Sequence, residues 1–247
     1  MLTKEVAIAL ADDAITLAVL QDKEISPSLL NGLSLLGFPD NLAMLPIGQA
    51  SQQTYELMRA SVTGLPADPS SRLLDELAAD FAAIYLTGAY GASPSESFWL
   101  SDDHLVCQEA MFDLRALYAA SGLAAPDWRM RPDDHLVFQL QFVARRLELA
   151  VSDDDWRSLA SFLDLHLLRW LPDFSSRTAA RCDTAFYGAL VILTNSWCQQ
   201  LRDLIADMLD EVRPSQEEIE EQLRAQRGAM PAPEPVHFVP GMHGPSW

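Results

Sequence analysis

The spacing of apolar residues near the C-terminal end of the chain constrains the fold more than any other feature. Between positions 186 and 208 these residues are separated by 4, 3, 4, 4, 3 and 4 positions, which places them on one face of a long helix. They are Phe186, Leu190, Leu193, Trp197, Leu201, Leu204 and Met208. Because no run of alternating β-branched residues occurs elsewhere, the sequence predicts an all-α fold.

Residues that favour helix ends mark several further helices. Ser26 and Pro27 suit a cap and a first turn, and Gly37 suits the end of the same helix. Ser152 begins another helix as a capping box with Asp155, and Pro172 is expected to end it. Including the apolar seam, we expect helices at residues 4–20, 26–37, 52–59, 70–87, from Asp102 or Asp103 to 120, 136–147, 152–172, 178–212 and 215–227.

Prolines divide this predicted bundle of about ten helices into two sub-domains. Pro126 and Pro132 stiffen a segment that has few apolar anchors, so it serves as a proline-bearing hinge loop. The hinge leaves open whether the two halves pack within a monomer or swap between the chains of a dimer. The expected parts are an N-terminal helical part (1–122), the hinge loop (123–133), a C-terminal helical part (134–213) and a charged, proline-rich tail (214–247).

The charge of the chain restricts its partners. The net charge of -18 over 247 residues argues against nucleic acid and favours a basic partner. Three cysteines, at positions 107, 182 and 198, are an odd number in apolar helical patterns, which indicates free thiols in a reducing compartment. No apolar run approaches the roughly 20 residues that span a bilayer, and no secretory signal is recognisable, so we expect a cytoplasmic protein.

Two loops between positions 88 and 135 combine aromatic, proline and acidic residues. The first loop carries Glu96, Phe98 and Trp99, and the second carries Trp128 before Asp133. Aromatic side chains in a loop either pack beneath it or bind a ligand. Apolar surface beside acidic groups suits a basic, apolar peptide better than it suits bond-breaking chemistry.

Catalytic and metal-binding interpretations find less support in the residues. His104, His135 and His166 fall on three different predicted helices with no i, i+4 pair, and His237 and His243 lie in the tail. We therefore expect no metal, no cofactor and no catalytic residue. Two alternatives remain open: an enzyme that uses Asp133, Asp134 and His135 as acid and base groups, and an α-helical scaffold subunit.

Three motifs occur in the order typical of one family. They are Asp80-Phe81 to Ile84-Tyr85-Leu86-Thr87-Gly88, then Pro94-Ser95-Glu96-Ser97-Phe98-Trp99, then Arg131-Pro132-Asp133-Asp134-His135-Leu136. A later pattern, His166-Leu167, Trp170, Phe174 and Phe186-Tyr187, continues the order. In these features the chain resembles the TorD/DmsD family of redox-enzyme maturation chaperones. Two residues depart from the family pattern: Ser95 stands where a large aromatic is frequent, and Arg131 replaces an acid.

The resemblance implies a cytoplasmic chaperone for a molybdenum-cofactor oxidoreductase. Such a chaperone binds the twin-arginine signal peptide, or the body, of the enzyme precursor and assists cofactor insertion before export. An apolar groove would supply most of the affinity, and the carboxylates of Glu96, Asp133 and Asp134 would pair with the arginines. The expected peptide-binding residues are Phe81, Ile84, Tyr85, Pro94, Ser95, Glu96, Ser97, Asp133, Asp134 and His135.

Overall fold

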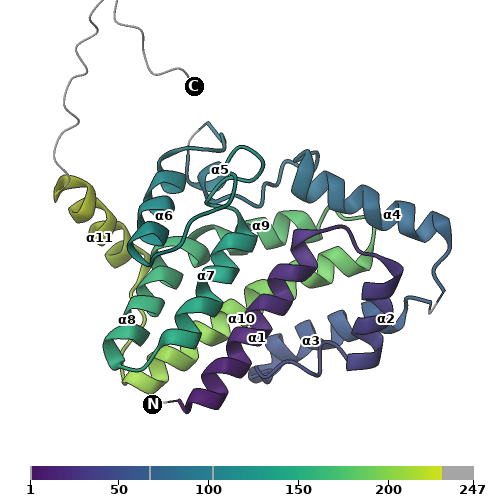
Figure 1. Ribbon diagram of the computed structural model, residues 1–247, viewed down its shortest axis with the longest axis horizontal. Coiled ribbons are helices and arrows are strands. Elements are labelled where there is room, and N and C mark those ends of the chain that lie inside the picture. The colour runs from purple at the N-terminus through teal and green to yellow at the C-terminus, as the bar shows by residue number, and fades with distance from the viewer. Residues whose placement is uncertain (1, 67, 102, 230–247) are drawn as a thin grey trace, which may run out of the picture. The chain divides into compact units, whose positions relative to one another are not determined.

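The structure, a computed structural model, describes residues 2–66, 68–101 and 103–229 (Figure 1). These residues form helices and no strand, which confirms the predicted all-α fold. Residues up to Arg213 cluster into one compact unit, and those from Pro214 onward into a second. The second unit contains helix α11 (Gln216–Ala229), whose charged sequence has few apolar residues. The predicted hinge at 123–133 stays a prediction.

Helix α10 (Ala185–Leu209) lies at the centre of the first unit. The seam residues Phe186, Leu190, Leu193, Trp197 and Leu201 are at most 1% exposed, because neighbouring helices cover this face. Burial of large apolar side chains contributes about 1.5–3 kcal/mol for each residue, so α10 anchors the core. Its partners are α3 (Gly48–Thr63), α4 (Ser71–Phe81), α8 (Asp153–Phe162) and α9 (Leu168–Ala179).

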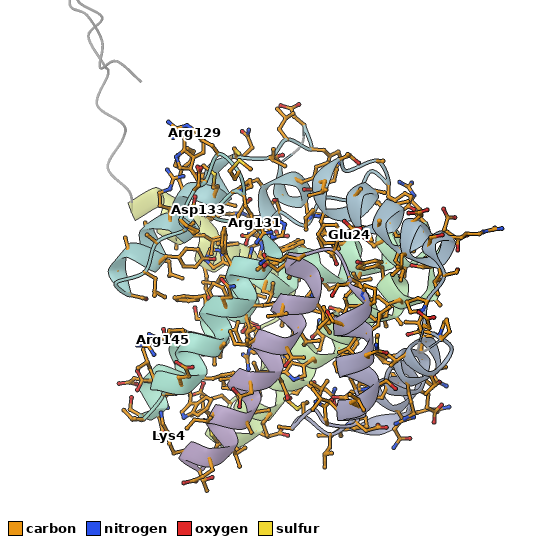
Figure 2. All side chains as sticks on the ribbon, turned by 45° about the vertical axis from the view of Figure 1, so that its right-hand side comes forward. Lys4, Glu24, Arg129, Arg131, Asp133 and Arg145 are labelled. Atoms are coloured by element: carbon orange, nitrogen blue, oxygen red, sulfur yellow. The ribbon has the colours of Figure 1, made fainter. Side chains whose placement is uncertain are left out.

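The most extensive helix–helix contact joins α1 (Lys4–Asp22) and α7 (Leu136–Leu149), which come from the two predicted halves of the chain. Figure 1 shows these two helices side by side. Ala7, Ala11 and Ala14 on α1 are buried, and their small side chains allow a close approach of helix axes. At the far end of this contact, Lys4 donates a hydrogen bond to the carbonyl of Glu148 (Figure 2).

Helix ends with strong local signals form as predicted. The Ser26 hydroxyl accepts from the Leu29 amide at 3.2 Å, and Gly37 ends the helix with φ +70°. Ser152 and Asp155 form the capping box at the start of α8. The remaining elements are α2 (Pro27–Leu36), α5 (Glu96–Leu100), α6 (Glu109–Ala120) and two π-helical turns, η1 (Ala82–Leu86) and η2 (Leu163–Leu167).

The prediction of a helix capped near position 103 is wrong. Helix α6 begins only at Glu109, after a turn in which His104 and Cys107 have positive φ. The Ser97 hydroxyl accepts from the Gln108 amide at 3.1 Å, so a residue of the preceding helix α5 rather than a local cap fixes the start of this helix. The alternative cap, Asp102, lies outside the described residues.

Two predicted ends near α9 and α10 are also wrong. Pro172 lies inside α9, because the fully buried Leu171 and Phe174 on either side outweigh the cost of about 3 kcal/mol for an interior proline. Helix α10 starts at residue 185 and not at 178. The carboxylate of Asp80 accepts the amide of Thr184 at 2.7 Å and so fixes a turn ahead of α10.

The described cysteines are free thiols: Cys107 and Cys182 are partly exposed, and Cys198 is buried. Within the described part of the chain, no helix combines the length and the apolar character that crossing a membrane requires.

Candidate functional site

The first wall of the site is the π-helical turn η1, which continues α4. A π turn carries one extra residue per turn and often occurs at functional positions. The rings of Phe81 and Tyr85 lie 5.0 Å apart between centres, and the Tyr85 hydroxyl donates to Oε1 of Gln21 at 3.0 Å. The sequence predicts a regular helix here, whereas Ala82–Leu86 form a π turn, and the contact of Tyr85 with α1 has no local signal in the sequence.

A pocket of about 470 Å³ lies against this turn. Six of the ten predicted peptide-binding residues line it, and they come from three separate stretches of sequence: Phe81, Ile84, Tyr85, Pro94, Ser95 and His135. Four further lining residues are exposed and apolar: Leu86, Leu105, Val106 and Met130. Exposed apolar side chains around a hollow are typical of a binding surface.

The sequence did not identify these four exposed residues as part of the site. Leu105 and Val106 were assigned to a helix, whereas they belong to the turn before α6. Leu86 and Met130 are 71% and 84% exposed. The sequence did contain a signal for them, because these apolar residues stand close to the motifs whose residues line the pocket.

Backbone hydrogen bonds join the two motif loops beneath the pocket. Leu136 donates its amide to the Pro94 carbonyl at 2.7 Å, and Glu96 donates to the Asp134 carbonyl at 3.1 Å. Ser95 and His135 form an isolated antiparallel bridge between these bonds. The second and third sequence motifs are therefore a single structural unit in space.

Asp134 holds this unit together from inside. It is fully buried, and its Oδ2 accepts the Ser97 amide at 2.7 Å and also the Ser97 hydroxyl. Its other oxygen has no hydrogen-bond partner among the described residues. Burial raises the pKa of this carboxyl, and the hydrogen bonds from Ser97 oppose that effect.

Glu96 and Asp133 are equally committed to contacts within the chain. Glu96 is 1% exposed, and its carboxylate accepts from Gln139 at 3.0 Å and lies 3.1 Å from Nδ1 of His166. Burial raises the pKa of Glu96, and His166 opposes this. Asp133 is 3% exposed and forms an ion pair with Arg115 at 2.9 Å.

The three carboxylates that were expected to pair with the arginines of the peptide are thus engaged in contacts within the chain. Glu96, Ser97, Asp133 and Asp134 do not line the pocket, and no acidic residue does so among the described residues. The sequence showed acids next to apolar loops, but each acid instead accepts a hydrogen bond from a backbone amide, an arginine or a side-chain amide of the chain itself. A role of these four residues in peptide contact stays a prediction.

His135 differs from its two acidic neighbours because it both lines the pocket and caps α7. Its Nδ1 accepts the Val137 amide at 3.2 Å, so the proton of the neutral ring resides on Nε2. Burial, together with Arg131, lowers the pKa of His135 to about 3. The ring is therefore neutral at physiological pH.

The alternative enzyme interpretation used three residues as acid and base groups. In the structure each of them makes a different contact within the chain. Asp133 pairs with Arg115, Asp134 binds Ser97, and His135 caps α7. No group of three or more His, Cys, Asp or Glu side chains arranged for a metal ion occurs in the described ranges. His237 and His243 lie outside those ranges.

Comparisons with known proteins agree on one family. The model of the nitrate reductase delta subunit family matches residues 47–176, a range that contains the whole pocket. A chaperone protein TorD of Photobacterium profundum is 28% identical over 177 residues, which cover 68% of this chain and 80% of that protein. A chaperone protein TorD of Vibrio vulnificus is 31% identical over 157 residues, or 58% and 73% of the two chains.

Proposed function

The chain belongs to the TorD/DmsD family, as its match to the nitrate reductase delta subunit model requires, and we propose that it is a chaperone for a molybdenum-cofactor oxidoreductase. In this proposal it works in the cytoplasm and is not an enzyme. It binds the twin-arginine signal peptide of its client and assists cofactor insertion before export.

The pocket beside η1 is the proposed peptide site. The observation that supports it is that six motif residues from three stretches of sequence line this one pocket. Its volume of about 470 Å³ is within the range of pockets that hold a drug-sized ligand. A pocket of that size accepts a few apolar side chains and not a whole peptide. The exposed side chains at its edge then cover the rest of the apolar stretch.

The buried carboxylates have a different task in this proposal. Asp134 and Glu96 join the two loops and so fix the shape of the pocket. The arginines of the signal peptide bind outside the pocket, where the net charge of -18 attracts them. Apolar contact supplies most of the affinity, because exposed ion pairs contribute only about 0–1 kcal/mol each.

Isothermal titration calorimetry with twin-arginine peptides tests the proposal. Leu86→Ser removes an exposed apolar side chain from the pocket edge, so we expect roughly five- to tenfold weaker binding, as the loss of about 1 kcal/mol of apolar burial implies. Leu35→Ser is the matched control, because Leu35 is 88% exposed and does not line the pocket. Equal affinities of the two variants, or no binding of any such peptide, would contradict the proposal.

A further inference from the structure

One wall of the pocket comes from Met130, Arg131, Pro132 and His135, and it carries a charge that the proposed function leaves unexplained. Arg131 is the one lining residue with a permanent charge in the described part of the chain. A cation here is unexpected for a protein of net charge -18 whose proposed ligand is itself cationic.

Contacts with α1 and α7 hold the guanidinium of Arg131 in place. One of its nitrogens donates to the carboxylate of Asp22, and the other donates to the Asp22 carbonyl at 3.0 Å. The guanidinium also lies over the ring of Phe138, 5.6 Å from the ring centre. Asp22 itself does not line the pocket, and its contacts use two of the five N–H donors of Arg131, which leaves three donors without a hydrogen-bond partner among the described residues.

His135 adds a second donor to the same wall. Because its Nδ1 accepts the Val137 amide, the Nε2–H group of the neutral ring has no hydrogen-bond partner among the described residues. The wall therefore favours hydrogen-bond acceptors and negative charge, whereas η1 on another side of the pocket offers apolar surface.

We propose that Arg131 fixes the direction in which an apolar segment lies in this pocket. The C-terminal end of the segment, with its acceptor groups, faces Arg131, and the arginines that precede the segment lie away from it. Like charges repel, and the last carbonyls of a helical segment are free to accept hydrogen bonds. The inference rests on the proposed function, and it specifies the ligand as an apolar segment followed by an acidic or uncharged acceptor residue.

Arg129 offers a matched control for Arg131. It lies two positions away on the same loop and stacks on Trp128, with the guanidinium 5.0 Å from the ring centre, but it does not line the pocket. Figure 2 shows Arg131 close to the end of α1 and Arg129 farther out on the loop. Removal of either charge changes the net charge of the protein equally.

Calorimetry with three twin-arginine peptides tests the inference on the unaltered protein. The peptides differ only in the residue directly after the apolar stretch, which is Glu, Gln or Lys. We expect the Glu peptide to bind about three- to tenfold more tightly than the Lys peptide. The net charge of the protein alone predicts the opposite order, so the two explanations give different results.

The same peptides on two variants locate the effect. Arg131→Gln is expected to abolish or reverse the preference for Glu, whereas Arg129→Gln retains it; circular dichroism verifies that both variants are folded. Tighter or equal binding of the Lys peptide to the unaltered protein overturns the inference, as does an unchanged preference in Arg131→Gln. In those cases peptide binding itself persists, whereas failure of all three peptides to bind overturns the proposed function as well.

Discussion

Two aspartates are buried almost equally, yet the protein satisfies them differently. Asp13 on α1 is 4% exposed, and both of its oxygens accept hydrogen bonds: Oδ1 from Ala43 at 2.8 Å, and Oδ2 from Met44 at 2.9 Å and from Trp197 at 3.0 Å. Asp134 between the motif loops is fully buried, but only Oδ2 has a partner in the described residues. Burial raises the pKa of both carboxyls.

The difference shows what each region is built for. Around Asp13 every oxygen is saturated by donors from separate segments, so the carboxylate locks the helices of the core in one arrangement. Beside the pocket, Oδ1 of Asp134 has no hydrogen-bond partner among the described residues, which costs free energy of folding.

Among the substitutions that test this comparison, Asp13→Asn is expected to lower the free energy of unfolding the most. In either orientation of the amide, its NH₂ group faces a donor that needs an acceptor. We expect the free energy of unfolding to fall by about 3 kcal/mol in urea denaturation. Asp12→Asn, on the exposed side of the same turn, is the control and is expected to change it by at most about 0.5 kcal/mol.

The pH dependence of stability tests whether His135 is held neutral where the two motif segments meet. Its pKa is about 3 in the folded protein and about 6.5 in the unfolded chain, so the unfolded chain binds an extra proton between these values. The contribution of His135 is complete above about pH 6.5 and is lost as the pH falls, by about 2 kcal/mol between pH 6.5 and pH 5.

His135→Asn isolates this contribution, because asparagine keeps an acceptor for the start of α7 and does not titrate. Denaturation curves of both proteins from pH 7 to pH 5 measure the difference. Glu96 and Asp134 act in the opposite direction, since their raised pKa values favour the folded state at lower pH, but they are present in both proteins. Parallel curves would show that the ring is not held neutral.

Asp134→Asn is expected to have the smallest effect. The amide oxygen keeps the hydrogen bonds from Ser97, and the NH₂ group occupies the position of the oxygen that lacks a partner. We expect a loss of about 1 kcal/mol or less in the same urea experiment. A loss as large as that of Asp13→Asn would remove the distinction between the two aspartates.

Local signals in the sequence located much of the fold. Ser26, Gly37 and the capping box at Ser152 mark helix ends through bonds within a few residues, so they need no knowledge of the rest of the chain. The apolar seam of α10 likewise follows from spacing alone. Two of the ends that failed, at Glu109 and Ala185, depend on hydrogen bonds that Ser97 and Asp80 accept, and these acceptors lie outside the local turn.

The same distinction between local signals and contacts in space applies to the candidate site. The order of the motifs singled out six of the residues that line the pocket, because those residue types are unusual in loops and occur in a family pattern. The direction of the carboxylates did not follow from the sequence. Glu96, Asp133 and Asp134 turn inward because Gln139, Arg115 and Ser97 meet them in space.

By itself the sequence determined most of the helices, the family and the two motif segments that form the site, since periodicity, caps and motifs are properties of neighbouring residues. Only the tertiary structure decided which of those loop residues face a hollow and which hold it together. A buried carboxylate must find donors wherever the packed chain provides them. For that reason no acidic residue lines the pocket among the described residues, although the chain as a whole is strongly acidic.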